Sequence, residues 1–448
     1  MTESSSHAGG EATELAADIR DYLIRYTDDF YERTIVKASG SWIEDDAGKR
    51  ILDFTSGQIC STIGHNHTDI LAAMRRSMDG ALHLFSGMLP PAVIELAKQL
   101  AAIAPPPLRK SLFVNTGGES NEAALKMAKM ATGGFEVIAL GGSWHGVTGT
   151  AAGATFASDR RGYGPPMPGN FAIPEPHAYR CPIEHCKNAC DKTCLRVGMK
   201  MFDAQSAGAP AAIVAEPVIS AGGVIVPPEG YFAALKQEAE QRGMLLIFDE
   251  AQTAFGRLGA WFAAGKIGVT PDLLTCSKTL GGGVPLAAVI ASAEVEERAH
   301  ARGFKNYTSH VADPLPAEVG LAVLMMIARD GLLEHATEMG TYLRSRLEEL
   351  QTRHQEIGDV RGDGLLLGVE LVRDRETREP HPALARRSTG ICLERGLSMN
   401  IRIRAERGSV WRIAPPLTVT REEIDLAVSI LDESIGQARD ELAREGDR

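Results

Sequence analysis

The sequence predicts an α/β protein, with a large domain built on a mostly parallel sheet and a smaller α+β domain formed from both chain ends. From residue 67 to about 325, short and continuously apolar runs alternate with longer helical stretches. Strands that are apolar throughout are typical of parallel sheets that helices cover on both faces. The chain has 448 residues, more than one core normally organises, and this length favours two domains.

Six apolar runs are the expected strands of the large domain: residues 111–115, 137–140, 211–215, 244–248, 273–276 and 287–292. Each run is bounded by turn or helix signals, and a helix is expected from Ser120.

Both chain ends contribute to the expected small domain. Residues 12–35 are expected to be helical and residues 40–53 to form a hairpin. After a long helix from about residue 318, strands are expected at 357–361, 365–371, 397–401 and 410–414, with a helix from Pro382 to Arg395. A last helix should begin near Thr420, where Thr-Arg-Glu-Glu is a capping-box pattern. We assign residues 1–11 to a disordered tail, 12–66 and 326–448 to the small domain, and 67–325 to the large domain with a Cys-rich insert at 177–200.

Charge and hydropathy limit the partners. The chain carries 47 basic and 58 acidic residues, a net charge of −11, which argues against binding to nucleic acid or to an anionic membrane surface. No stretch is apolar over the roughly 20 residues that a membrane helix needs. The N-terminus lacks the apolar core of a signal peptide. We therefore expect a cytoplasmic protein that contacts neither nucleic acid nor membrane.

Two apolar runs end in residues that suit catalysis. The run 244–248 leads into Asp249, and ligands of open α/β sheets bind just beyond the carboxyl ends of strands. The run 273–276 is followed by Ser277, Lys278 and a glycine-rich turn. A lysine at a strand end, next to another cation, can act as an amine nucleophile. Taken singly, Asp249 could cap a helix, and Lys278 could be a surface lysine before a flexible turn.

Two loops contain residues that are typical of ligand-binding sites. Thr116-Gly117-Gly118 forms a glycine-rich turn between a strand and a helix, and its free N–H groups suit a phosphate. Trp144-His145 is an aromatic pair on a loop beyond the run 137–140, which suits stacking on a flat ring. By itself, the first could be any tight turn and the second a tryptophan packed under its loop.

Together and in this order, these four elements resemble the fold-type I pyridoxal-phosphate (PLP) enzymes, and within them the class III (ω-type) aminotransferase family. The resemblance implies a seven-stranded sheet in the large domain and PLP as the cofactor. It implies that Lys278 carries PLP as a Schiff base, that Asp249 pairs with the pyridine nitrogen and that Gln252 lies near the phenolic oxygen. It places the other cofactor contacts of this subunit at Thr116, Gly117, Gly118, Trp144 and His145.

The resemblance also implies an assembly, because enzymes of this family form their sites at a dimer interface. A homodimer is the implied minimum, and two dimers could pair into a tetramer. Thr308 or Ser309 would then reach the PLP phosphate of the neighbouring subunit. The implied substrates are small-molecule amino acids and keto acids.

The outcome of PLP chemistry depends on where the substrate carboxylate is held, because the bond at Cα that stands perpendicular to the ring is the one that breaks. Arg412 matches the family's substrate arginine and offers a bidentate fork; a structural ion pair is its alternative role. Gln58 is the candidate donor for a carboxylate held out of plane, about to leave as CO₂. Otherwise Gln58 would satisfy loop backbone.

The blocks around these residues are similar to the dialkylglycine decarboxylase branch of the family. That similarity implies decarboxylation of 2,2-dialkylglycines such as 2-aminoisobutyrate, followed by amino transfer to pyruvate, with Lys278, Gln58 and Trp144 as catalytic residues. The alternative is an ω-aminotransferase that does not decarboxylate. Ala221 and Val147 depart from the branch and alter the pocket wall, so the preferred alkyl groups stay open. A DNA-binding regulator built on the same fold would need an additional domain, which we do not expect here.

Two groups of residues are candidate metal ligands. One matches the potassium site of that branch, where a hard cation would find an oxygen cage: Leu84, Ser86, Ser309, Val311 and Asp313. Asp313 could instead cap a helix. The other group could hold zinc or an iron–sulfur cluster: Cys181, Cys186, Cys190 and Cys194. Their spacing matches no common zinc pattern, so reduced thiols or a structural clasp are alternatives.

Overall fold

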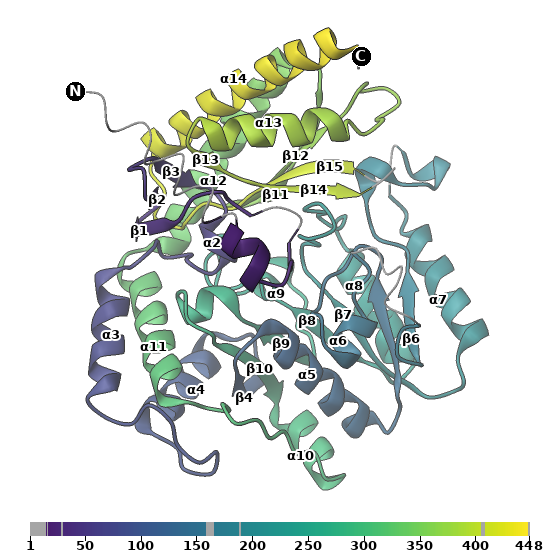
Figure 1. Cartoon of the computed structure of the whole chain (residues 1–448). Helices are drawn as coiled ribbons and strands as arrows, with labels where there is room; N and C mark the ends of the chain where they lie inside the picture. Colours follow the sequence, from purple (N-terminus) through teal and green to yellow (C-terminus); the bar gives the residue numbers. More distant parts are fainter. Residues whose placement is uncertain are drawn as a thin grey trace.

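The computed structural model describes residues 15, 17–27, 30–157, 165–187, 190–404 and 408–446. The tail predicted at residues 1–11 lies outside the described residues. The chain forms a large domain around one sheet and a smaller domain above it, to which both chain ends contribute (Figure 1). Among the described residues, we find no helix that combines the length and the apolar character needed to cross a membrane.

The large domain is built on a seven-stranded sheet with the order β4-β10-β9-β8-β7-β5-β6. Neighbouring strands are parallel except at β10, which runs antiparallel to both β4 and β9. The strands are β4 (Leu108–Val114), β5 (Glu136–Leu140), β6 (Asn170–Ile173), β7 (Pro210–Ala215), β8 (Leu245–Asp249), β9 (Leu273–Cys276) and β10 (Ala287–Ser292). The six runs predicted as strands are confirmed. The pattern misses β6, a four-residue edge strand that begins with a polar residue and is only partly buried.

The strands of this sheet bury side chains on both faces, as their continuous apolar character predicts. In β7, Ala212 and Val214 belong to one core cluster, whereas Ile213 and Ala215 belong to the other. The first cluster also contains side chains of α5 (Gly117–Thr132) and α10 (Ala293–Ala301). All six positions of β7 are therefore apolar, because each faces helices on one side of the sheet or the other.

Further helices complete the large domain. They are α2 (Ser56–Ile59), α3 (Thr68–Met78), α4 (Pro91–Ile103), α6 (Gly149–Gly153), α7 (Thr193–Gln205), α8 (Tyr231–Gln241), α9 (Ala263–Ile267) and α11 (Pro314–Arg329), with 3-10 turns η1 (Ala178–Arg180), η2 (Glu184–Lys187) and η3 (Lys278–Gly281). Helix α11 packs against α3 and α4 at one side of the sheet (Figure 1).

Two four-stranded sheets build the small domain, with the orders β1-β2-β3-β13 and β11-β12-β15-β14. Strand β13 pairs in parallel with β3, Leu397 opposite Leu52, so the C-terminal part of the chain completes a sheet that the N-terminal hairpin begins. Helix α13 lies beside α14 over these sheets (Figure 1). The elements are β1 (Ile35–Ser39), β2 (Trp42–Asp45), β3 (Arg50–Asp53), α12 (Leu332–Arg353), β11 (Ile357–Asp363), β12 (Leu366–Leu371), α13 (Pro382–Glu394), β13 (Leu397–Ser398), β14 (Asn400–Arg404), β15 (Gly408–Ile413) and α14 (Arg421–Glu445).

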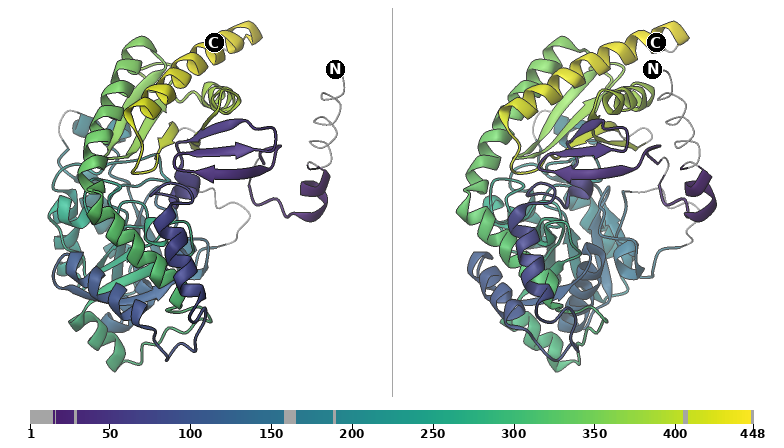
Figure 2. Two further views of the ribbon diagram at one scale, coloured as in Figure 1. Left: turned by 90° about the vertical axis from the view of Figure 1, so that its left-hand side faces the viewer. Right: turned by 60° about the vertical axis from the view of Figure 1, so that its left-hand side comes forward.

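Three predicted elements need correction. The helix predicted over 12–35 is confined, among the described residues, to 15 and 17–22. This short helix stands away from the rest of the subunit (Figure 2), so no tertiary packing extends it. The long helix predicted from about 318 is two helices, α11 and α12, separated at Gly331 with a φ of 62°. The strand predicted at 397–401 divides at Met399 between the two small-domain sheets. The start of α14 is confirmed, with both capping-box hydrogen bonds at Thr420.

Candidate active site

The candidate site lies at the edge where the parallel strands of the large sheet end. Asn115, Glu216 and Ser277 each follow the last residue of a strand, namely β4, β7 and β9, and Asp249 is the last residue of β8. Because these strands are parallel, their carboxyl ends share one edge of the sheet, which is where open α/β sheets bind ligands. The structure therefore places Asp249 and the predicted residues that follow β4 and β9, namely Thr116, Gly117, Gly118 and Lys278, at one edge of the sheet.

Asp249 is the buried anion of the site. Its Oδ2 accepts a hydrogen bond from Asn121 Nδ2 at 2.7 Å and lies 2.8 Å from His145 Nδ1, and its Oδ1 accepts from the N–H of Ala251 at 3.1 Å. Burial acts to raise the pKa of Asp249, but the bond to His145 and the other donors outweigh it and hold that pKa below its usual value. Asp249 is therefore an ionised carboxylate in a dry place, as a partner for a protonated ring nitrogen must be.

His145 lies behind this carboxylate rather than on an open loop surface. Its side chain is fully buried, its backbone N–H donates to Thr155 Oγ1 at 2.9 Å, and its carbonyl accepts from Asn121 Nδ2 at 2.7 Å. The predicted cofactor residue His145 thus acts on Asp249 by orienting it. The neighbouring Trp144 is half-buried, and its backbone N–H donates to Glu216 Oε1 at 2.8 Å.

Two buried residues of the site escaped the sequence prediction. Asn121 joins Asp249, the carbonyl of His145 and the hydroxyl of Thr275, which donates to its Oδ1 at 2.7 Å. Glu216 accepts the N–H groups of Trp144 and Ser220, and burial raises its pKa to about 7. Glu216 carried the same signal as Asp249, a carboxylate at the end of an apolar run. Asn121 lies inside a helix and carried no such signal.

Lys278 opens η3 directly after β9, with a φ of 45° in the left-handed region that few residues other than glycine adopt. Burial lowers the pKa of its ammonium group. The charge of Asp249 opposes that effect, and the charge of Arg412 adds to it. A lysine whose pKa is lowered by burial and by a neighbouring cation is a better amine nucleophile, as the prediction for Lys278 requires.

The N-terminus of α5 forms a cradle beside Lys278. Thr116 and Glu119 close a capping box, and no described residue accepts a hydrogen bond from the N–H of Gly117 or Gly118. A Cβ at Gly117 would lie 2.9 Å from Ser277 Oγ, and a Cβ at Gly146 would lie 2.7 Å from the Cα of Gly118. The glycines thus let the cradle approach its neighbours closely, and the free N–H groups at a helix N-terminus suit a phosphate.

The small domain supplies Arg412 from β15. Its side chain is only 4% exposed, and its one hydrogen-bond partner among the described residues is Gln252 Oε1, at 3.4 Å from Nη1. Gln252 Oε1 also accepts from Ser220 Oγ at 2.7 Å. The alternative role of Arg412 as half of a structural ion pair has no carboxylate to support it in the described chain. A buried guanidinium with so few partners is suited to an anionic ligand.

Gln58 sits on a sharply bent loop over the same site. Ser56, Gly57 and Ile59 all have positive φ, and Asp53 holds the loop by accepting the N–H of Gly57 at 2.6 Å and of Thr55 at 3.0 Å. The side-chain amide of Gln58 is exposed and hydrogen-bonds to no described residue. The loop lies near the lysine, because Thr62, just beyond it, accepts a hydrogen bond at Oγ1 from Thr279 Oγ1, next to Lys278, at 3.0 Å. Burial raises the pKa of Cys60 on this loop, and the charge of Lys278 opposes that effect.

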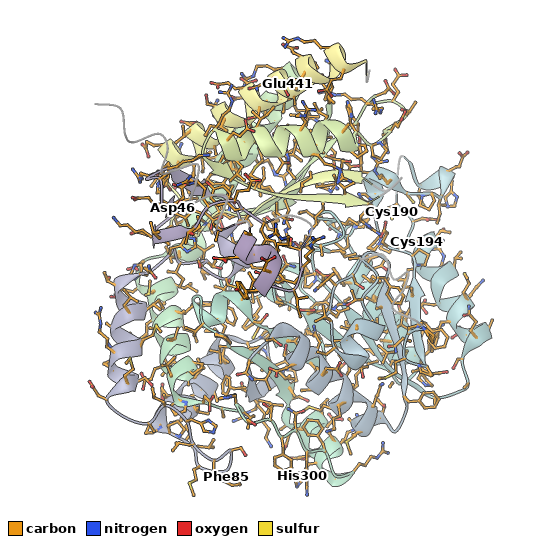
Figure 3. The ribbon with its side chains drawn as sticks, viewed as in Figure 1. Asp46, Phe85, Cys190, Cys194, His300 and Glu441 are labelled. Carbon is orange, nitrogen blue, oxygen red and sulfur yellow. The ribbon has the colours of Figure 1, made fainter. Side chains whose placement is uncertain are left out.

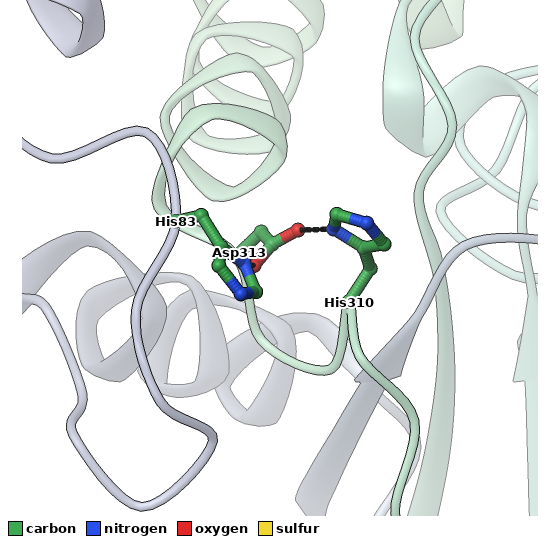
Figure 4. A group of neighbouring side chains, drawn as sticks. All are labelled: His83, His310 and Asp313. Carbon is green, nitrogen blue, oxygen red and sulfur yellow. Dashed lines mark hydrogen bonds and ion pairs between the residues drawn. The ribbon is translucent and has the colours of Figure 1, made fainter.

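The remaining predicted residues lie away from this centre. Thr308 and Ser309 are on the surface of the subunit, so their reach to a partner's phosphate stays a prediction. Asp313, at the start of α11, makes no capping bond; its Oδ1 and Oδ2 lie 2.8 and 2.6 Å from Nδ1 of His83 and His310 (Figure 4). Two imidazoles contact the carboxylate that was predicted to bind potassium, and the potassium site stays a prediction. The companions predicted for that site are half-buried (Leu84 and Ser86), exposed (Ser309) or buried (Val311).

The Cys-rich insert forms a separate corner of the large domain. Its four cysteines are reduced, with Cys186 and Cys194 buried, Cys181 half-buried and Cys190 exposed. Cys190 precedes α7 and Cys194 is in its first turn (both labelled in Figure 3). Burial, with the charges of the other three thiols, raises the pKa of Cys194 to about 11. Asp191 accepts from Cys186 Sγ at 3.2 Å and from the N–H of Thr193, the first residue of α7, at 3.0 Å. The predicted zinc or iron–sulfur site stays a prediction.

Comparison with known proteins agrees with this geometry. The aminotransferase class-III family profile matches residues 25–435. The chain belongs to the class III aminotransferase family. An uncharacterised aminotransferase of Schizosaccharomyces pombe is 47% identical to it over 414 residues, 92% of each chain. The leucine/methionine racemase of Thermococcus litoralis is 33% identical over 417 residues, again 92% of each chain. The (S)-enantioselective ω-transaminase of Thermomicrobium roseum superposes with a TM-score of 0.85 at 31% identity, over 95% of this chain and 98% of that one.

This class III aminotransferase has the fold-type I architecture, and PLP is the cofactor typical of its family. The residues present fit that cofactor. The free N–H groups of Gly117 and Gly118 suit its phosphate, the ionised Asp249 suits its protonated ring nitrogen, and Lys278 supplies the amine. The hydrogen-bond capacity left open at these positions is what a bound PLP would use.

Proposed function

We propose that this enzyme transfers an amino group from an amine or amino acid to a keto acid such as pyruvate, with PLP held by Lys278, Asp249 and the N-terminus of α5. The observation that carries the proposal is Arg412, a buried guanidinium that no described carboxylate pairs with and whose charge acts on Lys278 to lower its pKa. A bidentate arginine holds a substrate carboxylate in one orientation.

Each group has a definite task in this proposal. Bound PLP supplies an electron sink for the bonds at the substrate's α-carbon. Asp249, fixed by Asn121 and His145, keeps a negative charge beside the ring nitrogen. Arg412 holds the carboxylate so that the Cα–H bond, rather than the Cα–carboxylate bond, is labile. The amine of Lys278 then takes the proton from the α-carbon.

The test is to incubate the PLP-loaded enzyme with a panel of amines and amino acids together with pyruvate and to measure alanine by chiral chromatography. We expect alanine to form with at least one donor, and Lys278→Ala to abolish it. Interconversion of the enantiomers of one amino acid, with no alanine from any donor, would refute amino transfer. It would point instead to racemisation, the activity in the name of the Thermococcus relative.

A second candidate is the decarboxylation of 2,2-dialkylglycines coupled to the same transfer. The exposed side-chain amide of Gln58, on the loop near Lys278, favours it: no described residue bonds to that amide, and such a donor could hold a carboxylate out of plane. We expect CO₂ from 2-aminoisobutyrate and pyruvate. Gln58→Ala should lower the rate of CO₂ release about 10- to 100-fold, because the loss of one hydrogen bond to a charged group costs about 1.5–3 kcal/mol. Equal losses in alanine formation from a primary amine would contradict this role for Gln58.

We also propose a homodimer as the working unit. Large apolar side chains are exposed on the subunit surface, including Tyr22, Ile24, Phe85 and Tyr307, which are 82%, 87%, 73% and 78% exposed. Exposed apolar groups of this size mark protein interfaces. The segment with Tyr307 also holds Thr308 and Ser309, whose proposed contact is the phosphate of the second subunit. Sedimentation equilibrium at micromolar protein should give twice the 48.0 kDa mass of the chain, or a multiple of that value if dimers pair.

A further inference from the structure

The small-domain sheet β11-β12-β15-β14 turns a row of arginines toward the active site. Arg402 on β14 is paired with Val410 on β15, and Arg412 lies two residues beyond Val410. Side chains alternate along a strand and opposite residues share a face, so Arg402 and Arg412 project from the same side of the sheet. Arg404 lies on that side too, and its Nη1 donates to the carbonyl of Gly222 in the large domain at 3.0 Å. This face therefore looks toward the large domain.

The arginines of this face differ in their partners. Arg361 forms ion pairs with Asp359 and Glu370 at 2.8 and 2.6 Å, and Arg404 pairs with Glu175 at 3.2 Å. Arg402 and Arg412 have no carboxylate within ion-pair distance among the described residues. The Nε of Arg402 is buried without any hydrogen-bond partner, and Arg412 has only the long contact to Gln252.

Glu216 does not neutralise these two guanidinium groups. Its charge acts on both of them, but its oxygens already accept the N–H groups of Trp144 and Ser220. Burial raises the pKa of Glu216 to about 7, so this carboxyl group is only partly ionised near neutral pH. Burial lowers the pKa of Arg412 to about 9, and the charge of Arg402 adds to that effect. Two adjacent, poorly solvated cations are stabilised by an anion that carries more than one charge.

We propose that Arg402 forms a second carboxylate subsite next to Arg412, so that the enzyme takes a dicarboxylic amino acid or keto acid in one of its half-reactions. Arg412 would hold the α-carboxylate and Arg402 the distal one. Diagonal neighbours on antiparallel strands stand about 7–8 Å apart, on the scale of a short dicarboxylate such as glutarate. The inference names the substrate class for the amino transfer proposed above and rests on it.

The test measures binding, so that it does not depend on turnover. Isothermal titration calorimetry of the PLP-loaded enzyme compares glutarate with pentanoate, which has the same chain length and one carboxylate. We expect glutarate to bind at least about tenfold more tightly, since a charge-assisted bidentate pair at Arg402 would be worth that factor or more. Arg402→Met should erase the difference, Arg402→Gln should do the same with a polar side chain, and the exposed Arg386→Met should retain it.

Three results would overturn the subsite. Glutarate and pentanoate could bind equally to the unaltered enzyme, or the advantage of glutarate could survive in Arg402→Met. Equal weakening of both ligands by Arg402→Met would show that the two arginines share a single carboxylate. Kinetics separate failure of the subsite from failure of the proposed function. If Arg402 forms the subsite, Arg402→Met lowers kcat/KM for 2-oxoglutarate and leaves kcat/KM for pyruvate unchanged. If no keto acid accepts an amino group, the proposed amino transfer is refuted. The calorimetric comparison of glutarate with pentanoate still tests the carboxylate subsite, because it measures binding and not turnover.

Discussion

Replacing Arg412 by Met should remove substrate binding while leaving the fold intact. Arg412 is 4% exposed and has one long hydrogen bond, to Gln252, so its removal strands no buried carboxylate. Replacing a buried charge by an apolar side chain of similar size is often neutral or stabilising. The substrate carboxylate, in contrast, would lose its partner in a desolvated charge pair, a loss of about 2–5 kcal/mol. That range is about 30- to 4,000-fold in kcat/KM.

The assay compares two amino donors, one with an α-carboxylate and one amine without it. We expect Arg412→Met to lower kcat/KM for the amino acid by the factor above and to change that for the amine by less than a few-fold. Arg361→Met provides the contrast, because it removes the ion pair to Asp359 and one of the two ion pairs of the buried Glu370, which keeps Arg180. That variant should be destabilised by about 1–3 kcal/mol, visible as a lower Tm. Equal losses with both donors, or a Tm of Arg412→Met as low as that of Arg361→Met, would refute the assignment of Arg412 to the substrate.

Three further predictions test the surroundings of the site. In Gly146→Ala the new Cβ would meet the backbone of Gly118 at 2.7 Å, so this variant should displace the start of α5 and lose PLP faster on dialysis. The control is Gly390→Ala, in a helix with free space around the residue, which should add about 0.5–1 kcal/mol of stability. Equal retention of PLP by the two variants would contradict the role of the cradle. Asp53 has a pKa held below its usual value, against burial, by the bond to His65 and by donors of its own loop. The ionised Asp53 therefore stabilises the fold fully above about pH 4, the ordinary pKa of Asp, and this stabilisation is lost as the pH falls through the lower pKa of the folded state. The Tm difference between wild type and Asp53→Asn should shrink below pH 4. A Tm difference that already shrinks above pH 5 would argue against this role of Asp53. If Asp313 binds a potassium ion, exchange of potassium for tetramethylammonium should lower the activity, and Asp313→Ala should abolish this dependence on the cation. An activity that is the same in both salts would refute the potassium prediction.

The sequence by itself determined the large sheet and the centre of the site. Continuous apolar runs predict strands buried on both faces, and in β7 the side chains do alternate between two cores. Parallel strands end at one edge, so Asp249, Lys278 and the turn at Gly117 had to meet there once the strands were recognised. Local pattern was sufficient for these residues because each one ends its own strand or lies within three residues of the strand's end.

Only the tertiary structure decided which distant residues surround that centre. Arg402 faces the site because of the register between β14 and β15, and a shift of one residue would turn it to the other face. Asn121, inside α5, reaches Asp249 because the helix packs across the sheet. The loop of Gln58 lies over Lys278 because β13 pairs with β3 and closes the small domain from both chain ends. The packing of α5 on the sheet and the pairing of β13 with β3 join residues more than a hundred positions apart, and no local sequence pattern records them.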